Sequence, residues 1–172
     1  DQKIAYAHYL IAVILYEQIL DEKKDINPLI ESKKKINFFL KNYPDTEYAL
    51  DLKFKKDLIN NQLAAKEMYV AKYYIKTQKW IPAINRLKVI LNDYSETVFI
   101  EEALHRLVEV YYKVGLIDEA KSAAIILGYN YNSSEWYSQS YKILNKTYKT
   151  PKKSDKKSND GLIKRTIKKI LN

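Results

Sequence analysis

The sequence predicts an all-α protein, built as a right-handed solenoid of antiparallel helix pairs. Three observations predict this fold. Only 3 Gly and 4 Pro occur in 172 residues, which is too few for the many turns of an all-β fold. Apolar residues recur at intervals of three and four almost throughout, as on the buried face of a helix. A short pattern of residue types also occurs three times along the chain, which is typical of stacked repeats.

Two helices are expected before the first sharp turn. The first covers about residues 4–20. Pro28 suits the first turn of the second helix, which is expected to end near residue 42. Pro44 then interrupts the helical hydrogen bonds. The Thr46 hydroxyl is expected to accept a hydrogen bond from a backbone N–H at the start of the next helix.

One long helix is predicted next, because neither Gly nor Pro interrupts residues 46–78. We expect a single helix here, not two. Its apolar residues, with Leu50, Phe54 and Leu58 among them, are expected to face neighbouring helices.

Four shorter helices complete the predicted body. Their boundaries are marked by glycine and hydroxyl residues, because glycine suits the end of a helix and a hydroxyl suits its start. Gly128 in particular is expected to cap the helix that precedes it. The helices are expected at about 80–92, 97–114 and 117–127 and from Ser134 onward, with a turn at Gly115.

Three segments align without gaps and carry the repeat. In each, a small residue, two apolar residues, a Tyr and a hydroxyl residue follow at spacings of 4, 3, 4 and 3. The third segment follows the second by 37 residues, close to the 34-residue tetratricopeptide period, and the second follows the first by 51. The longer interval corresponds to about four added helical turns, which the long helix supplies. The segments are Ser32, Ile36, Phe39, Tyr43, Thr46; Ala83, Leu87, Ile90, Tyr94, Thr97; and Ala120, Ala124, Leu127, Tyr131, Ser134.

The positive charge of the chain is concentrated at its C-terminal end. The formal net charge is +9, of which residues 149–172 carry +7, so the rest of the chain is nearly neutral at +2. We therefore expect a helical repeat domain at 1–148, a flexible linker at 149–160 and a basic amphipathic helix at 161–172. The charged face of that helix, suited to an anionic membrane or a partner, would present Lys164, Arg165, Lys168 and Lys169.

No arrangement of residues in the sequence predicts catalysis or a cofactor. The chain has no Cys, and its glycines are too few and too isolated to build a phosphate-binding loop. His8 and His105 are far apart, lack metal-ligand spacing and read as surface or helix-flank histidines. We expect no enzyme activity, no metal and no cofactor.

Several short sequence segments between residues 4 and 144 resemble those of a known family. Leu63-Ala-Ala-Lys-Glu-Met-Tyr-Val-Ala-Lys-Tyr-Tyr74 is followed by the step Asn85-Arg86, and Asn42-Tyr-Pro-Asp-Thr46 fits the same pattern. With these runs the chain resembles the BamD family, the tetratricopeptide lipoproteins of the bacterial outer-membrane β-barrel assembly machinery. One departure is Thr77-Gln78-Lys79, where the family usually has a Gly before the aromatic residue.

The resemblance implies a non-catalytic scaffold of the outer-membrane protein assembly complex, at the periplasmic face of the outer membrane. The implied partners are the periplasmic POTRA domains of BamA, other outer-membrane assembly lipoproteins, and unfolded outer-membrane protein clients whose insertion it assists. It also implies membrane attachment through an N-terminal lipid anchor that this sequence lacks. No nucleic-acid partner is implied.

Arg86 stands at the position where the family contributes an ion pair to the last POTRA domain. Arginine offers a planar, bidentate fork that lysine cannot imitate. The choice is notable in a chain whose other basic residues are nearly all Lys. An ion pair to a neighbouring helix of the same chain accounts for Arg86 equally well, and both interpretations stay open.

The 16 tyrosines divide into two expected groups. Tyr43, Tyr74, Tyr94, Tyr111 and Tyr131 are expected to pack in the core or at helix ends. Amphipathic aromatic side chains on a groove suit the binding of an extended peptide. The residues expected on the groove side are Tyr48, Tyr69, Tyr73 and Tyr112.

Two other functions remain open from the sequence. One is a generic tetratricopeptide adaptor for another protein partner. The other is a nucleic-acid-associated helical repeat protein that uses the basic tail. The nearly neutral body and the scarcity of arginine weigh against this second alternative.

Overall fold

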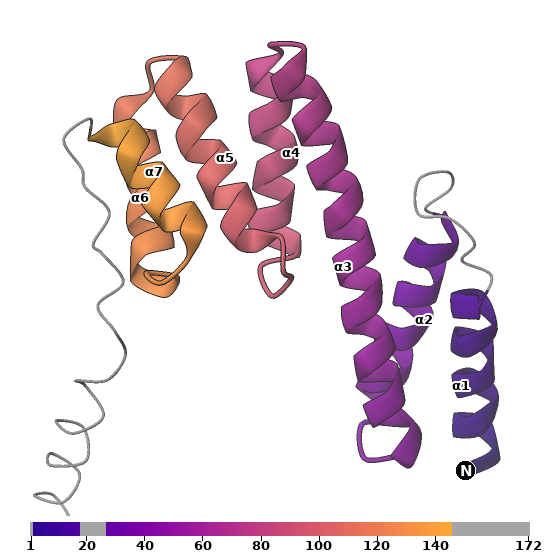
Figure 1. Cartoon of the computed structure of the whole chain (residues 1–172). Helices are drawn as coiled ribbons and strands as arrows, with labels where there is room; N and C mark the ends of the chain where they lie inside the picture. Colours follow the sequence, from indigo (N-terminus) through magenta and orange to yellow (C-terminus); the bar gives the residue numbers. More distant parts are fainter. Residues whose placement is uncertain (1, 18–26, 146–172) are drawn as a thin grey trace, which may run out of the picture.

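A computed structural model describes residues 2–17 and 27–145 of the chain. Over these ranges it contains helices and no strand, as predicted (Figure 1). The expected linker at 149–160 and basic helix at 161–172 lie outside the described residues. The helices are α1 (Gln2–Glu17), α2 (Asn27–Asn42), α3 (Glu47–Lys76), α4 (Trp80–Asp93), α5 (Ile100–Lys113), α6 (Ile117–Asn130) and α7 (Glu135–Leu144).

The helices succeed one another across the molecule in chain order, from α1 and α2 at one end to α6 and α7 at the other (Figure 1). The closest packing joins α1 with α2, α3 with α4, and α5 with α6, while α7 lies against both α5 and α6. Each unit therefore buries its apolar face against the next one, as a stacked repeat requires.

The residues of the predicted repeat lie at equivalent positions in α2, α4 and α6. The first three positions of each segment are buried, which confirms that the repeat marks the inward face of the second helix in each pair. The Tyr of each segment follows its helix directly. Its backbone N–H donates to the carbonyl four residues earlier, at 2.8 Å for Tyr43, 3.0 Å for Tyr94 and 2.8 Å for Tyr131.

The hydroxyl residues that close the repeats cap the following helices in only one case. Ser134 accepts a hydrogen bond from the Trp136 N–H at 3.1 Å, as expected. The expectation for Thr46 is wrong, because its hydroxyl donates instead to the Tyr43 carbonyl at 3.0 Å. Thr97 donates in the same way to Tyr94 at 2.7 Å. Because each of these hydroxyls donates to the Tyr that directly follows the preceding helix, it is part of the turn and does not cap the next helix.

Helix α3 is a single helix of 30 residues, about 45 Å long, as predicted. It connects two hydrophobic clusters. Its first half contributes Leu52 and Ile59 to a cluster with α1 and α2, and its second half contributes Met68 and Ala71 to a cluster with α4, α5 and α6. The long helix is therefore the structural link between two parts of the solenoid.

One face of α3 departs from the prediction. Leu50, Phe54 and Leu58 were expected to face neighbouring helices, but their side chains are 77%, 63% and 37% exposed. The expectation is wrong because α1 and α2 cover only one side of the first half of α3, where Ala49 and Leu52 are buried.

The turns between paired helices share one geometry. Gln78, between α3 and α4, has φ of 58°, and Gly115, between α5 and α6, has φ of 84°. Both N–H groups donate to the carbonyl three residues earlier, at 3.1 Å and 3.2 Å. The turn thus requires a left-handed residue, which glycine adopts at little cost. Gln78 meets the same requirement without being glycine.

Helix α6 runs past the predicted cap. Gly128 lies inside the helix, which ends at Asn130 and is capped at Tyr131, so the expected glycine cap is wrong. The structural reason for glycine is close packing. A Cβ at this position would lie 2.5 Å from Cε2 of Tyr137 on α7. Glycine here allows α7 to approach α6.

Candidate docking surfaces

Arg86 lies on the surface shared by α3 and α4. Its Nη1 donates to both carboxylate oxygens of Glu67, at 3.3 Å and 3.2 Å. The ion pair is partly open to solvent, since the Arg86 side chain is 45% exposed. Within the described part of the chain, Nε and Nη2 of Arg86 make no hydrogen bond. The guanidinium therefore pairs with a neighbouring helix and still offers one edge to a partner.

A groove of about 710 Å³ lies where the end of α3 meets α4, α5 and α7. Its walls carry Trp80 and Tyr112, and the Lys113 ammonium lies 5.3 Å from the centre of the Trp80 ring. Aliphatic contacts come from Ile75 and Ile143. An aromatic wall beside cationic side chains can accept an extended, amphipathic peptide.

The tyrosines expected on the groove side take different positions. Tyr112 lines the groove directly. Tyr69 and Tyr73 are 66% and 55% exposed on α3, and Tyr73 precedes the groove residue Lys76 by three positions, which places the two on adjacent helical turns. Tyr48 instead stacks on Tyr9 with ring centres 4.7 Å apart and belongs to the packing of α1.

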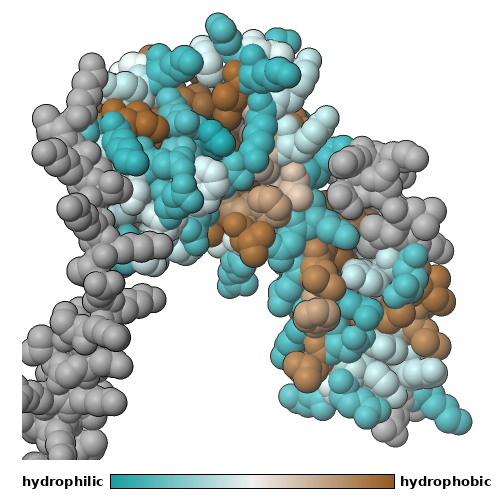
Figure 2. Space-filling model, viewed as in Figure 1, coloured by the Kyte–Doolittle hydropathy of each residue, from teal (hydrophilic) through white to brown (hydrophobic). Residues whose placement is uncertain are grey.

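An exposed apolar stripe occupies the first half of α3. It consists of Leu50, Phe54 and Leu58, which are spaced by four residues and so share one face. Brown side chains follow this part of α3 in Figure 2. Large apolar side chains gathered on a surface are typical of a protein contact. Sequence analysis missed this surface because spacing alone does not say which apolar face is buried.

The two histidines differ in their surroundings. His8 is half-buried and stacks near Phe38 and Tyr43, with ring centres 5.0 Å and 5.9 Å away. The expectation of a surface or helix-flank position is wrong for His105, because its side chain is 2% exposed and lies on the buried face of α5. Its Nδ1 lies 2.9 Å from the buried Ser140 Oγ of α7. Helix α7 covers the face of α5 that carries His105.

His105 belongs to a polar network that holds α7 against α5. Its Nε2 lies 3.6 Å from Glu109 Oε1, and Arg106 donates to the other Glu109 oxygen at 2.6 Å. The Arg106 guanidinium also lies 5.6 Å from the centre of the Trp136 ring. Burial favours the neutral form of Glu109, but hydrogen bonds from His105 and Arg106 outweigh it and lower the pKa of Glu109 to about 2.

The side chains of Ser140, His105 and Glu109 contact one another in the same order as the three side chains of a hydrolase triad. Here the three side chains serve the packing of α7 on α5. Ser140 is fully buried, so no substrate carbonyl can reach its oxygen.

Residues 2–17 and 27–145 contain no cluster of three His, Asp or Glu side chains suited to a metal ion. Among the same residues, no helix is both long enough and apolar enough to span a bilayer.

Comparison with known proteins identifies the family. The family model YfiO, described as an outer membrane lipoprotein, matches residues 1–126. The chain belongs to the BamD family. It is 42% identical to the outer membrane protein assembly factor BamD of Rickettsia prowazekii over 141 residues, which are 82% of this chain and 56% of the relative. It is 39% identical to the BamD of Caulobacter vibrioides, over 81% of this chain and 46% of the relative.

A more distant BamD relative, from Vibrio cholerae, is 28% identical over 55% of this chain and 39% of its own length. The chain therefore spans about half the length of the first two BamD relatives and a smaller share of the third. The match confirms the predicted resemblance to BamD and agrees with the helical repeat structure. All three relatives are named as assembly factors.

Proposed function

We propose that this BamD-family chain is a non-catalytic scaffold of the outer-membrane protein assembly complex. It works at the periplasmic face of the outer membrane, docks the POTRA domains of BamA and assists insertion of β-barrel proteins. The family match over residues 1–126 carries the proposal. The exposed Arg86 and the groove where the end of α3 meets α4, α5 and α7 support the proposal, because a scaffold needs accessible recognition surfaces on a rigid frame.

Arg86 is the proposed contact to BamA. Its pairing with Glu67 uses Nη1 alone and leaves Nε and Nη2 to bind a carboxylate of the partner. A guanidinium already held in place loses less conformational entropy on binding than a free one. Glu67 is thus proposed to orient Arg86 for the partner.

The groove is proposed to receive unfolded client segments. Tyr69 and Tyr73, which are exposed on α3, are proposed to extend the aromatic surface that Tyr112 and Trp80 form in the groove. Tyrosine contributes a large contact area with little loss of rotamer freedom, which suits sequences of varied composition. Other assembly lipoproteins are proposed to bind the apolar stripe of α3.

The docking proposal is tested by pull-down of purified POTRA domains with the wild-type chain and Arg86→Glu. Lys88→Glu is the matched control, because it makes the same charge change on the same helix. We expect Arg86→Glu to recover at least tenfold less partner, as for loss of a charged hydrogen-bonded pair, and Lys88→Glu to recover the wild-type amount. Equal recovery by Arg86→Glu would contradict the proposed contact.

The groove proposal has a separate test. Replacing both Tyr69 and Tyr73 with Ala should weaken binding of an unfolded outer-membrane protein while leaving POTRA recovery unchanged. Fluorescence anisotropy of a labelled, urea-diluted client measures the first quantity. Unchanged client affinity would remove these two residues from the binding surface.

A further inference from the structure

The first half of α3 carries a hollow on a side that no other described helix covers. Leu50 and Phe54 line this hollow, and Leu58 follows them on the same face of the helix. The hollow has a volume of about 600 Å³. In Figure 1, α4 and α5 lie alongside the other half of α3 and leave this side open. The apolar stripe is therefore free to receive a segment from outside the described residues.

Carboxylates surround the hollow. Its lining contains Glu47, Asp51 and Asp57 against one lysine, Lys53. Asp51 already pairs with Lys55 at 3.1 Å. Glu47 and Asp57 are exposed and form no ion pair with the described residues. An apolar surface with free carboxylates beside it, in a chain whose formal net charge is +9, favours a ligand that is both apolar and cationic.

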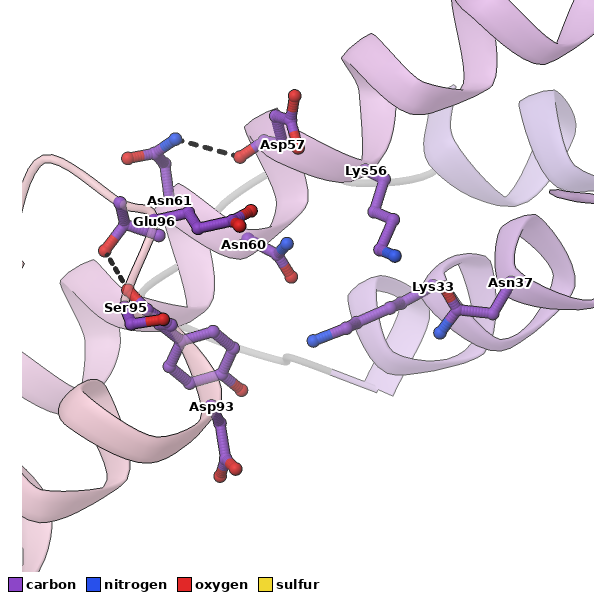
Figure 3. Close-up of a pocket in the computed structure, with 11 residues that line it drawn as sticks. Lys33, Asn37, Lys56, Asp57, Asn60, Asn61, Asp93, Ser95 and Glu96 are labelled. Atoms are coloured by element: carbon purple, nitrogen blue, oxygen red, sulfur yellow. Dashed lines mark hydrogen bonds between the residues drawn. The ribbon is translucent and has the colours of Figure 1, made fainter.

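Asp57 also borders a polar cleft on the neighbouring side of α3. That cleft lies between α2, α3 and the loop before α5, and it contains Lys33 and Lys56 (Figure 3). The Asp57 carboxylate points away from both lysines. Asn61 donates to the backbone carbonyl of Asp57 at 2.9 Å and not to its carboxylate (Figure 3). The carboxylate is therefore available to a ligand in the apolar hollow.

The C-terminal segment of the same chain has the complementary chemistry. Residues 161–172, which lie outside the described residues, are expected from their sequence to form a helix with one apolar and one basic face. Ile163, Ile167 and Ile170 of the apolar face would span about 10 Å along such a helix, close to the about 12 Å of the stripe on α3. The basic face consists of Lys164, Arg165, Lys168 and Lys169.

The position of the segment in the chain is compatible with this match. Residues 146–160, which precede it, reach up to about 50 Å when extended, whereas α3 is about 45 Å long. The exposed apolar side chains of α6 fit the segment less well. There Ile125 lies two turns after Asp118, whose carboxylate already pairs with a lysine at 3.5 Å.

We propose that residues 161–172 dock as a basic amphipathic helix on the apolar stripe of α3 in the same chain. The isoleucines cover the stripe, and the basic side chains pair with Glu47 and Asp57. The contact adds no residue to the two hydrophobic clusters, so it shields the stripe and contributes little to thermal stability. The contact does not depend on the function proposed above. One consequence does: an assembly lipoprotein that binds the stripe has to displace this segment.

Paramagnetic labelling tests the contact in the full, isotope-labelled chain. The sequence has no Cys, so Asn172→Cys accepts a single nitroxide label beside the segment. We expect the amide signals around Phe54 of α3 to broaden and those around Ile125 of α6 to keep their intensity. Equal broadening on both helices, or none on α3, would overturn the proposal. Broadening between chains, in a mixture where one carries the isotope and another the nitroxide, would also overturn it by assigning the segment to a second copy.

Apolar variants test the stripe itself. Leu50→Gln combined with Phe54→Gln removes two exposed apolar side chains and keeps good helix-forming residues. Ile125→Gln combined with Ile126→Gln makes a comparable change on α6 and is the matched control. We expect the first pair to abolish the broadening on α3 and the control to preserve it. Circular dichroism verifies that both variants fold. Broadening that survives the first pair would overturn the proposal.

Charge variants test the acidic side chains separately. Glu47→Gln combined with Asp57→Asn removes two carboxylates beside the stripe, and Asp118→Asn combined with Glu119→Gln removes two exposed carboxylates on α6. We expect the first pair to reduce the broadening on α3 and the second to leave it unchanged, because screened charges act over short distances. Equal reduction by the two pairs would show general attraction of the tail and overturn the proposal.

Discussion

At the scale of single residues, Gln78 holds a conformation that glycine would hold at lower cost. Its φ of 58° matches the role of Gly115 in the next repeat, and the N–H groups of both turns bond in the same way. The missing glycine was visible in the sequence as a departure from the family. Only the backbone shows that the turn keeps its shape without it.

Exchanging these turn residues should change stability in opposite directions. Gln78→Gly should raise the free energy of unfolding by about 0.5–1 kcal/mol, because it removes left-handed strain. Gly115→Gln should lower it by about 1 kcal/mol, although nothing lies within 4 Å of the added Cβ. Urea denaturation measures both. A loss of stability in Gln78→Gly would show that its side chain matters more than its backbone.

Glu109 should make stability depend on pH. Its pKa falls from an ordinary 4.5 to about 2 on folding, so its contribution is complete above pH 4.5 and is lost as the pH falls toward 2. Glu109→Gln should cost about 1 kcal/mol at pH 7, after allowance for the screening of its partly exposed carboxylate. Thermal unfolding at several pH values should show the two proteins converging below pH 4.5. A constant difference down to pH 2 would contradict the assignment.

Functional side chains are only partly predictable from sequence. The arginine at position 86 is singled out by its rarity among many lysines, but the free edge left by Glu67 depends on tertiary packing. His105 is on the buried face of α5 only because α7 covers it.

At the scale of helices, the positions of Gly, Pro and Tyr predict where most helices begin and end. The long α3 follows from the absence of breakers, and its single-helix character is confirmed. Two kinds of expectation fail. The Thr46 and Thr97 hydroxyls donate backward to the Tyr carbonyl three residues earlier, although Thr46 still directly precedes α3. Gly128 serves helix packing and does not end its helix, because it lies against Tyr137 of α7, a neighbour that a local pattern does not contain.

The packing role of Gly128 can be separated from its helix propensity. Alanine in a helix interior is favoured over glycine by about 1 kcal/mol. Gly128→Ala should nevertheless destabilise the chain by about 1 kcal/mol, because the added Cβ collides with Tyr137. In a Tyr137→Ala background the same substitution should become stabilising, as a double-mutant cycle would show. Stabilisation in both backgrounds would remove the packing explanation.

At the scale of the whole molecule, the repeat spacing predicts the solenoid and the charge partition predicts its neutral body. The buried first three positions of all three segments show why: each unit uses the same residues to contact the next. Which apolar faces remain open, such as the Leu50 and Phe54 stripe, follows from the order of stacking and not from the repeat.

The basic C-terminal residues should contribute to binding and not to folding. Deleting residues 150–172 removes most of the excess positive charge, so binding to vesicles containing anionic lipid should weaken. The melting temperature should change by less than about 2 °C, because we expect the tail to stay outside the hydrophobic clusters that the described residues form. A much larger drop would show that the tail packs within those clusters.

The central claim is that the chain docks a partner through the guanidinium of Arg86, which also forms an ion pair with Glu67 of its own chain. Isothermal titration of POTRA domains into wild type, Arg86→Gln and Glu67→Gln tests it most directly, since both variants break the same internal ion pair. We expect Arg86→Gln to weaken the Kd at least tenfold and Glu67→Gln to keep it within about threefold, because only the first removes the guanidinium. Equal losses in the two variants would contradict the claim and reduce Arg86 to an internal structural contact.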